Sequence, residues 1–101
     1  MNREAYGMLG ILSRARLIVF GPAVAGSMRK ASLLLLAKDG SSWTIKECLA
    51  KANEFHVRVH YVETKEELGA PLGRPELTAV AVTSKKAADS LLEKLQKGET
   101  P

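Results

Sequence analysis

The sequence predicts an α/β fold, a three-layer α/β/α sandwich around a mixed four-stranded sheet. Two observations support this prediction: an all-leucine run at residues 33–36, and the alternation of helical and extended patterns along the chain. Four consecutive leucines have no polar face, so we expect a strand that is covered on both sides. Alternating strands and helices place helices on both faces of a sheet that is largely parallel or mixed.

The length and composition fit one compact domain spanning residues 1–101. Hydrophobic residues make up 46% of the 101 residues and charged residues 26%, as in ordinary globular proteins. No apolar run approaches the roughly 18 residues of a membrane span, and residues 1–6 are too polar to open a signal peptide. The single cysteine cannot form an internal disulfide. We therefore expect a cytoplasmic protein.

The first third of the chain predicts two helical segments around a short strand. Residues 3–14 carry apolar side chains at the helical period, and Gly7 and Gly10 in this helix indicate close packing against a neighbour. Residues 17–20 form an apolar run that Gly21 and Pro22 end. Pro22 suits the first turn of a helix, so we expect a short helix over 23–31, interrupted at Gly26.

The remaining elements follow from apolar periodicity and from capping residues. Ser41, Ser42 and Thr44 offer caps for the helix that follows the leucine run. Thr44 with Glu47, and Thr64 with Glu67, have the spacing of capping boxes, and Ser84 is placed to cap the last helix. Gly98 ends that helix, and residues 99–101 are expected to be frayed. The expected elements are, in order, a strand at 33–37, a helix at 43–55, a strand at 58–62, a short helix from Thr64, a loop at 74–76, a strand at 77–82 and a final helix.

The net charge of +4 comes entirely from the first third of the chain. Residues 1–32 carry five basic side chains and one acidic side chain, whereas residues 33–101 carry ten of each. A localised basic excess is typical of a nucleic-acid-binding protein. A solvated surface with a modest charge imbalance would give the same count, so the charge alone leaves both interpretations open.

The histidines and the cysteine do not predict a metal site. His56 and His60 are four residues apart, but a strand begins between them and no cluster of carboxylates or thiols completes a ligand set. We expect both to be surface or edge histidines. Cys48 lies on the apolar face of its helix, which predicts a buried, inert thiol. No cofactor is expected.

The polar turn after residues 33–37 does not predict catalysis. Asp39 lies close to Ser41 and Ser42, but no second carboxylate, nucleophile elbow or glycine-rich phosphate loop accompanies it. We expect Asp39 to hydrogen-bond backbone amides near the turn, and the protein to be no enzyme. A small enzyme built around Asp39 is the weaker alternative. Trp43, the only tryptophan, is expected to be at least partly buried, although an exposed stacking surface is possible.

Three groups of residues carry a resemblance to a known protein family. They are the segment 9–16 before Gly21, the apolar run 33–41 that ends in Ala-x-Asp, and the Lys-x-x-Leu-Gly motif at 65–69, which Gly73 and the apolar run 79–83 follow. Together they resemble the ribosomal protein L-seven-Ae family, the kink-turn RNA-binding proteins, in its short bacterial form, and the resemblance covers about residues 7–95. The resemblance implies the three-layer fold and an RNA-binding role, with the ribosome as a possible partner.

The resemblance also implies where RNA would bind and how this chain departs from the family. The family reads RNA with a Gly-x-Asn-Glu segment followed by a lysine. Here residues 21–27 keep Gly21 but lack the Asn, Glu and Lys, and the segment is about three residues shorter. The loop after Gly73 corresponds to the family's second RNA-contacting loop. Loss of the base-reading side chains predicts reduced selectivity, and a protein-interaction module that kept the fold is the alternative function.

The predicted RNA contacts combine backbone approach, phosphate contacts and loop contacts. Arginine guanidinium groups pair with phosphates, and amides at a helix start can hold one. We expect Gly21, Pro22, Lys38 and the 73–76 loop to lie at one end of the sheet. The predicted RNA-binding residues are Arg14, Arg16, Gly21, Pro22, Arg29, Lys38, Arg74, Pro75, Glu76 and Leu77.

Overall fold

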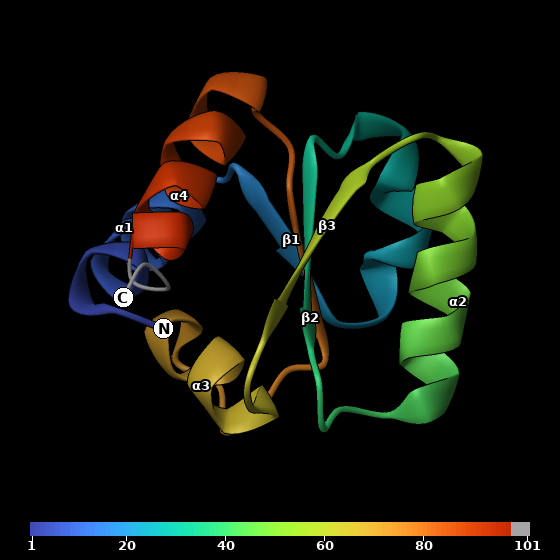
Figure 1. The fold of residues 1–101 in the computed structure, drawn as a ribbon, viewed down its shortest axis with the longest axis horizontal. Coiled ribbons are helices and arrows are strands. Elements are labelled where there is room, and N and C mark those ends of the chain that lie inside the picture. Colours follow the sequence, from blue (N-terminus) through green and yellow to red (C-terminus); the bar gives the residue numbers. More distant parts are fainter. Residues whose placement is uncertain (98–101) are drawn as a thin grey trace.

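A computed structural model describes residues 1–97, and its four-stranded sheet lies between two helical layers (Figure 1). The predicted α/β/α sandwich with a mixed sheet is confirmed. The end of the last helix at Gly98 and the fraying of residues 99–101 lie outside the described residues. The elements are α1 Arg3–Arg14, β1 Ile18–Phe20, β2 Leu33–Ala37, α2 Ser42–Glu54, β3 Arg58–Val62, α3 Lys65–Gly69, β4 Ala79–Val82 and α4 Lys85–Lys97, with 3₁₀ turns η1 Gly21–Ala23, η2 Ala25–Lys30 and η3 Ala70–Leu72.

The strand order across the sheet is β1-β4-β2-β3. β2 and β3 run parallel, whereas β4 runs antiparallel to both β1 and β2. β1, β2 and β3 therefore finish at the end of the sheet where β4 begins. We call this end, at the bottom of Figure 1, the lower end, and the opposite end the upper end.

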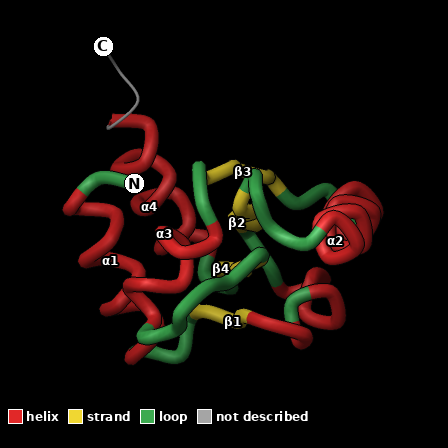
Figure 2. The backbone as a smooth tube through the Cα atoms, turned by 90° about the horizontal axis from the view of Figure 1, so that it is seen from below, coloured by secondary structure: helices red, strands yellow, loops and turns green. Residues whose placement is uncertain are grey.

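The leucine run is buried on both faces, as its lack of a polar face predicted. All five residues of β2 have at most 1% of their surface exposed. Leu33 and Leu35 belong to the apolar cluster that includes side chains of α1 and α4, and Leu34 and Leu36 pack with Cys48 and Ala52 of α2. Figure 2 shows α1, α3 and α4 on one side of the strands and α2 on the other. The two cores thus share β2, and they also share β4, whose residues alternate between the two clusters.

The two glycines of α1 differ in their surroundings. A Cβ atom built on Gly10 would lie 3.4 Å from the backbone oxygen of Pro71, so α1 packs closely against η3 there. Gly7 has nothing within 4 Å of such a Cβ atom, and the prediction of close packing was wrong for it. Ala5, Leu9 and Leu12 are the buried residues of α1, and the backbone at Gly7 faces away from that side. Gly7 is therefore a helix position without a packing role.

Three segment boundaries differ from their predicted form. Residues 21–30 form two 3₁₀ turns in place of one interrupted helix. α2 begins at Ser42, because the Ser41 side chain accepts the Thr44 N–H at 3.3 Å. Of the three predicted caps, Ser41 is confirmed, whereas the capping box of Thr44 with Glu47 was wrong. β4 begins at Ala79 rather than at Leu77. The predicted caps at Thr64 and Ser84 are confirmed, since their hydroxyl oxygens accept backbone N–H groups at 3.0 and 3.2 Å.

Candidate nucleic-acid interface

A hollow of about 360 Å³ opens at the lower end of the sheet, where β1 finishes and β4 begins. The segment after β1 and the segment before β4 form opposite walls of this hollow, and α2 closes it. The structure therefore brings Gly21, Pro22, Glu76 and Leu77 together. The lining residues are Gly21, Pro22, Ala25, Thr44, Glu47, Cys48, Glu76, Leu77, Thr78 and Ala79. Sequence reasoning did not select Thr44, Glu47 or Thr78.

Gly21 forms the turn in the segment after β1, which is one wall of the hollow. Its φ of 76° lies in the left-handed region, which glycine adopts without steric cost. Pro22 is the second residue of η1, and both Pro22 and Ala23 are exposed. The guanidinium of Arg74 lies 4.9 Å from the centre of the Phe20 ring, so the loop before β4 contacts the end of β1 directly. A ligand at this wall would meet backbone groups rather than long side chains.

The loop at 73–77 is held by backbone contacts with α3. A Cβ atom on Gly69 would lie 2.8 Å from the Arg74 carbonyl oxygen and 2.9 Å from the Cα of Glu76, so the loop packs on the bare backbone of this glycine. The Arg74 N–H donates to the Gly69 carbonyl at 3.0 Å, and the Leu77 N–H donates to the Lys65 carbonyl at 2.9 Å. Because these bonds are internal, the loop is formed before any ligand arrives.

Asp39 fixes the turn after β2. Its carboxylate accepts the Lys65 N–H at 2.7 Å, which ties the end of β2 to the start of α3. The predicted hydrogen bond from a backbone amide is confirmed, although this amide belongs to a different element rather than to the turn itself. On the other side of the turn, the Ser41 N–H donates to the Thr78 hydroxyl at 3.1 Å. Both contacts give Asp39 and Ser41 a structural role.

Trp43 is exposed, so the expectation of burial was wrong. It has 72% of its surface exposed, in the first turn of α2. The buried residues of this helix are Cys48 and Ala52, and Trp43 points away from them. It borders an open hollow of about 540 Å³ lined by Lys38, Gly40, Ser42, Trp43, Ile45, Lys46 and Leu49. An exposed indole beside lysines is a surface on which an unpaired base can stack.

The electrostatics of the lower end are not basic. Its basic groups are Lys38, Lys46, Lys65, Arg74 and the amino terminus of Met1, which pairs with Glu67. They are slightly outnumbered by six acidic side chains: Asp39, Glu47, Glu63, Glu66, Glu67 and Glu76. Lys38 pairs with Glu63 at 2.8 Å, and Lys65 pairs with Glu76 at 3.3 Å. The hydrogen bond from Lys38 lowers the pKa of Glu63, and the hydrogen bond to Glu76 raises the pKa of Lys65. Three of these five cations are therefore paired within the molecule, together with three of the six carboxylates.

The remaining predicted contacts lie at the upper end, away from the hollow. Arg14 ends α1, and Arg16, with a φ of 61°, lies just before β1. Arg29 is in η2, with its guanidinium 5.5 Å from the centre of the Phe55 ring. The fold thus divides the predicted residues into two groups: Gly21, Pro22, Lys38 and residues 74–77 at the lower end, and the three arginines at the upper end.

Other reactive groups form no second site within residues 1–97. No three His, Cys, Asp or Glu side chains gather there in a way that could hold a metal ion. The thiol of Cys48 is buried as predicted, and burial, followed by the charge of Glu47, raises its pKa. Among these residues, no helix combines the length and apolar character needed to cross a membrane.

Comparison with known proteins decides the family. Residues 26–92 match the model of the ribosomal protein L7Ae/L30e/S12e/Gadd45 family. The chain belongs to this family. It is 36% identical over 95 residues to the RNA-binding protein YlxQ of Bacillus subtilis (strain 168), an alignment that covers 91% of this chain and 95% of YlxQ.

Solved structures of other proteins share this L7Ae-type fold. A protein of unknown function from Bacillus halodurans C superposes with a TM-score of 0.84 at 22% identity, covering 94% of this chain and 99% of that protein. The Giardia lamblia 15.5kD RNA-binding protein superposes with a TM-score of 0.71 at 14% identity, covering 96% and 92% of the two chains. At these identities the likeness establishes the fold.

Proposed function

We propose that this protein binds RNA at the lower end of its sheet and catalyses no reaction. The observation that carries the proposal is its 36% identity, over nearly the full length of both chains, to a protein described as RNA-binding. Membership of the L7Ae/L30e/S12e/Gadd45 family supports the same conclusion. RNA associated with the ribosome is the partner that the family resemblance favours, and the cytoplasm is the corresponding location.

The geometry of the lower end indicates how RNA would be held. Gly21 and Pro22 face residues 76 and 77 across the hollow, so an RNA strand lying there meets backbone amides and carbonyls from both walls. Trp43 adds an exposed aromatic face beyond the turn after β2. Phosphate attraction is weak here, because acidic side chains outnumber basic ones. Shape, backbone hydrogen bonds and stacking therefore supply the affinity at this surface.

Selectivity for kink-turn RNA is expected to be reduced. Base-edge contacts specify a site, whereas phosphate and sugar contacts position the protein without reading sequence. Residues 21–27 lack the Asn, Glu and Lys that read bases in the family resemblance, while Gly21 keeps the backbone approach. We expect binding of several structured RNAs with similar affinity.

A titration tests the proposal, with Trp43 as an internal reporter. Trp43 is the only tryptophan and is 72% exposed, so a base stacked on it should quench its fluorescence. The protein is titrated at low salt with kink-turn RNA, duplex RNA and single-stranded RNA, and affinity is measured in parallel by anisotropy of labelled RNA. Strong preference for the kink-turn would show that backbone atoms at 21–25 replace the missing side chains. Absence of binding to all three RNAs would leave the protein-interaction module as the function.

A charge variant localises the surface. Glu76→Gln removes a carboxylate from the wall of the hollow and frees Lys65 from its ion pair, so RNA affinity at low salt should rise severalfold. Glu93→Gln removes the same charge from the exposed part of α4 and serves as the matched control. Equal effects of the two variants would place the RNA elsewhere on the molecule.

A further inference from the structure

The upper end of the sheet collects basic side chains from every part of the chain. Ile18, Val82, Leu33 and Arg58 lie in one row across the four strands, so the segments flanking them meet at this end. These segments are the end of α1, the end of η2, the start of β3 and the start of α4. The upper basic surface formed there, with Lys51 of α2, consists of Arg14, Arg16, Arg29, Lys30, Lys51, Arg58, Lys85 and Lys86, all exposed.

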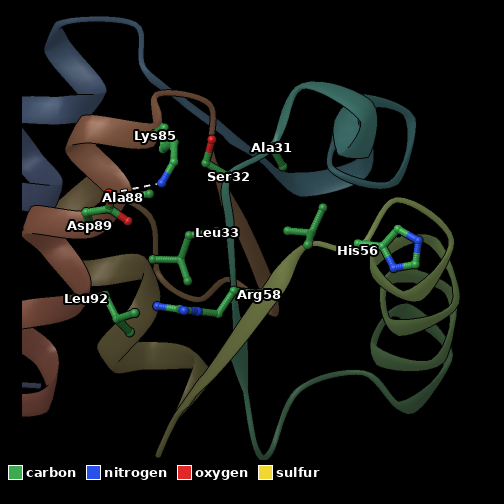
Figure 3. Close-up of a pocket in the computed structure, with 10 residues that line it drawn as sticks. Ala31, Ser32, Leu33, His56, Arg58, Lys85, Ala88, Asp89 and Leu92 are labelled. Atoms are coloured by element: carbon green, nitrogen blue, oxygen red, sulfur yellow. Dashed lines mark hydrogen bonds and ion pairs between the residues drawn. The ribbon is translucent and has the colours of Figure 1, made fainter.

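Two hollows lie within this surface, and two hydrogen bonds hold two of its segments together. One hollow of about 260 Å³ includes Ser32, Arg58 and Lys85 in its lining, and another of about 380 Å³ includes Arg29, Lys30 and Lys51. The Leu17 carbonyl accepts both the N–H and the hydroxyl of Thr83, at 2.9 and 3.2 Å, which holds Arg14 at the end of α1 and Arg16 after it near the start of α4. Figure 3 shows Arg58 and Lys85 extending into the space between β2 and α4.

Most of these charges have no internal partner. Within residues 1–97, two acidic side chains form ion pairs with the upper basic surface: Glu54, 3.6 Å from Lys51, and Asp89, 3.4 Å from Lys85. Five of its cations form no ion pair within residues 1–97: Arg14, Arg16, Lys30, Arg58 and Lys86. The lower end shows the opposite arrangement, with more acidic than basic side chains.

The stability of α4 does not explain why basic side chains lie in its first turn. The positive end of a helix dipole favours acidic side chains in the first turn. α4 has none there, and it begins with Lys85 and Lys86 instead. Two cations at this position repel the dipole and each other, whereas a bound phosphate would be attracted by both the lysines and the helix end.

We propose that the upper basic surface binds the phosphate backbone of a second RNA segment, so that one protein molecule joins two segments. This rests on the proposed RNA binding at the lower end. The described chain extends 27–30 Å along its axes, so the two surfaces lie on opposite sides of a compact body. A short straight duplex lying against one surface does not reach the other. Arginine and lysine contacts to phosphate carry no sequence preference, so the second segment is bound through the charge of its phosphate groups.

The experiment measures bridging between two labelled RNAs. A kink-turn RNA carries a fluorescence donor, and a short RNA duplex carries an acceptor. The protein should bring them together, giving energy transfer at protein concentrations too low to saturate both RNAs. Arg14→Gln with Arg58→Gln removes two unpaired cations of the upper surface, and Arg3→Gln with Lys97→Gln is the control of equal net charge. Circular dichroism confirms that both variants are folded.

The expected result is loss of energy transfer in the Arg14 and Arg58 variant and its retention in the control. The logarithm of duplex affinity should depend less steeply on the logarithm of salt concentration in that variant, by about 1.5 to 2 units, because each phosphate contact contributes about 0.9. Equal behaviour of variant and control would overturn the proposal in favour of unspecific charge attraction. Binding of anionic phospholipid vesicles without energy transfer between RNAs would also overturn it, in favour of a lipid surface.

Trp43 separates failure of this inference from failure of the proposed function. Trp43 lies at the lower end, away from Arg14 and Arg58. Quenching of Trp43 by RNA without energy transfer would leave RNA binding at the lower end in place and remove the second surface. Duplex binding that depends on Arg14 and Arg58 but leaves Trp43 unchanged would instead remove the lower site and leave the upper basic surface as the binding site.

Discussion

Replacing Gly69 by alanine is expected to destabilise the protein, whereas the same change at Gly7 is expected to stabilise it. Both glycines lie in helices with ordinary helical backbone, so alanine relieves a conformational cost of about 1 kcal/mol at each position. At Gly7 the new methyl group meets nothing within 4 Å. The expected result there is a gain of about 0.5–1 kcal/mol.

At Gly69 the methyl group meets backbone atoms that cannot move independently. It would lie 2.8 Å from the Arg74 oxygen and 2.9 Å from two backbone atoms of Glu76. Overpacking costs about 1–3 kcal/mol, and three backbone contacts shorter than 3.0 Å place this site in the upper half of that range, at about 2–3 kcal/mol. Subtracting the gain in helix propensity of about 1 kcal/mol leaves a net loss of about 1–2 kcal/mol. For a domain of this size each kcal/mol shifts Tm by about 4–8 °C.

Thermal and urea unfolding of both variants measure these differences. In Gly69→Ala, amide NMR shifts should also change at Arg74 and Leu77, whose N–H groups donate to Gly69 and Lys65. A neutral or stabilising Gly69→Ala would show that the loop is not packed on this glycine. The loop would then not be held in place by this contact before a ligand binds, whatever the outcome at Gly7.

Three further outcomes test the core, the turn and the thiol. Leu35→Ala should cost about 2–5 kcal/mol in urea unfolding, because the side chain is fully buried in the central strand; a loss below about 1 kcal/mol would make the position peripheral. Asp39→Ala should lower stability by about 1–3 kcal/mol, because the Lys65 N–H loses its charged acceptor. If the protein had a hydrolase activity and this variant abolished it, the conclusion that the protein is no enzyme would be overturned. Cys48 should react with a thiol reagent more slowly than free cysteine at pH 8, because its raised pKa reduces the thiolate fraction. The reaction rate should increase at higher pH. Labelling as fast as that of free cysteine would contradict the burial of Cys48.

The central strand could be predicted from the sequence because a strand that is buried on both faces has only apolar side chains. Residues 33–36 have no polar side chain, and only a strand covered on both faces accommodates them. Trp43 was misjudged from its size alone, although its position held the necessary information. At about 100° per residue, the helical period places Trp43 roughly 200° around the helix from Ile45, away from the core face. Tryptophan tends to be buried, but the position of Trp43 in the helical period places its side chain on the exposed side of α2.

The division of charge could not be read from the order of residues. Counting along the chain gives residues 33–101 a net charge of zero. Pairing of the strands places Arg58 and the lysines at the start of α4 at the upper end, while Glu63 and Glu76 lie at the lower end. Residues 33–101 are thus neutral in total, although the fold places these basic and acidic side chains at opposite ends of the sheet. The same pairing separates Arg14, Arg16 and Arg29 from Gly21, which sequence reasoning had combined in one interface.

The central position of β4 determines when the protein can fold during its synthesis. β1 pairs only with β4, and β4 also separates β1 from β2. A nascent chain that lacks Ala79–Val82 can pair β2 with β3, but its first strand has no partner and its sheet has an open edge beside the leucine run. Pairing across so many residues closes long loops, which slows folding relative to local contacts. Most of the chain must therefore leave the ribosome before the apolar core can close.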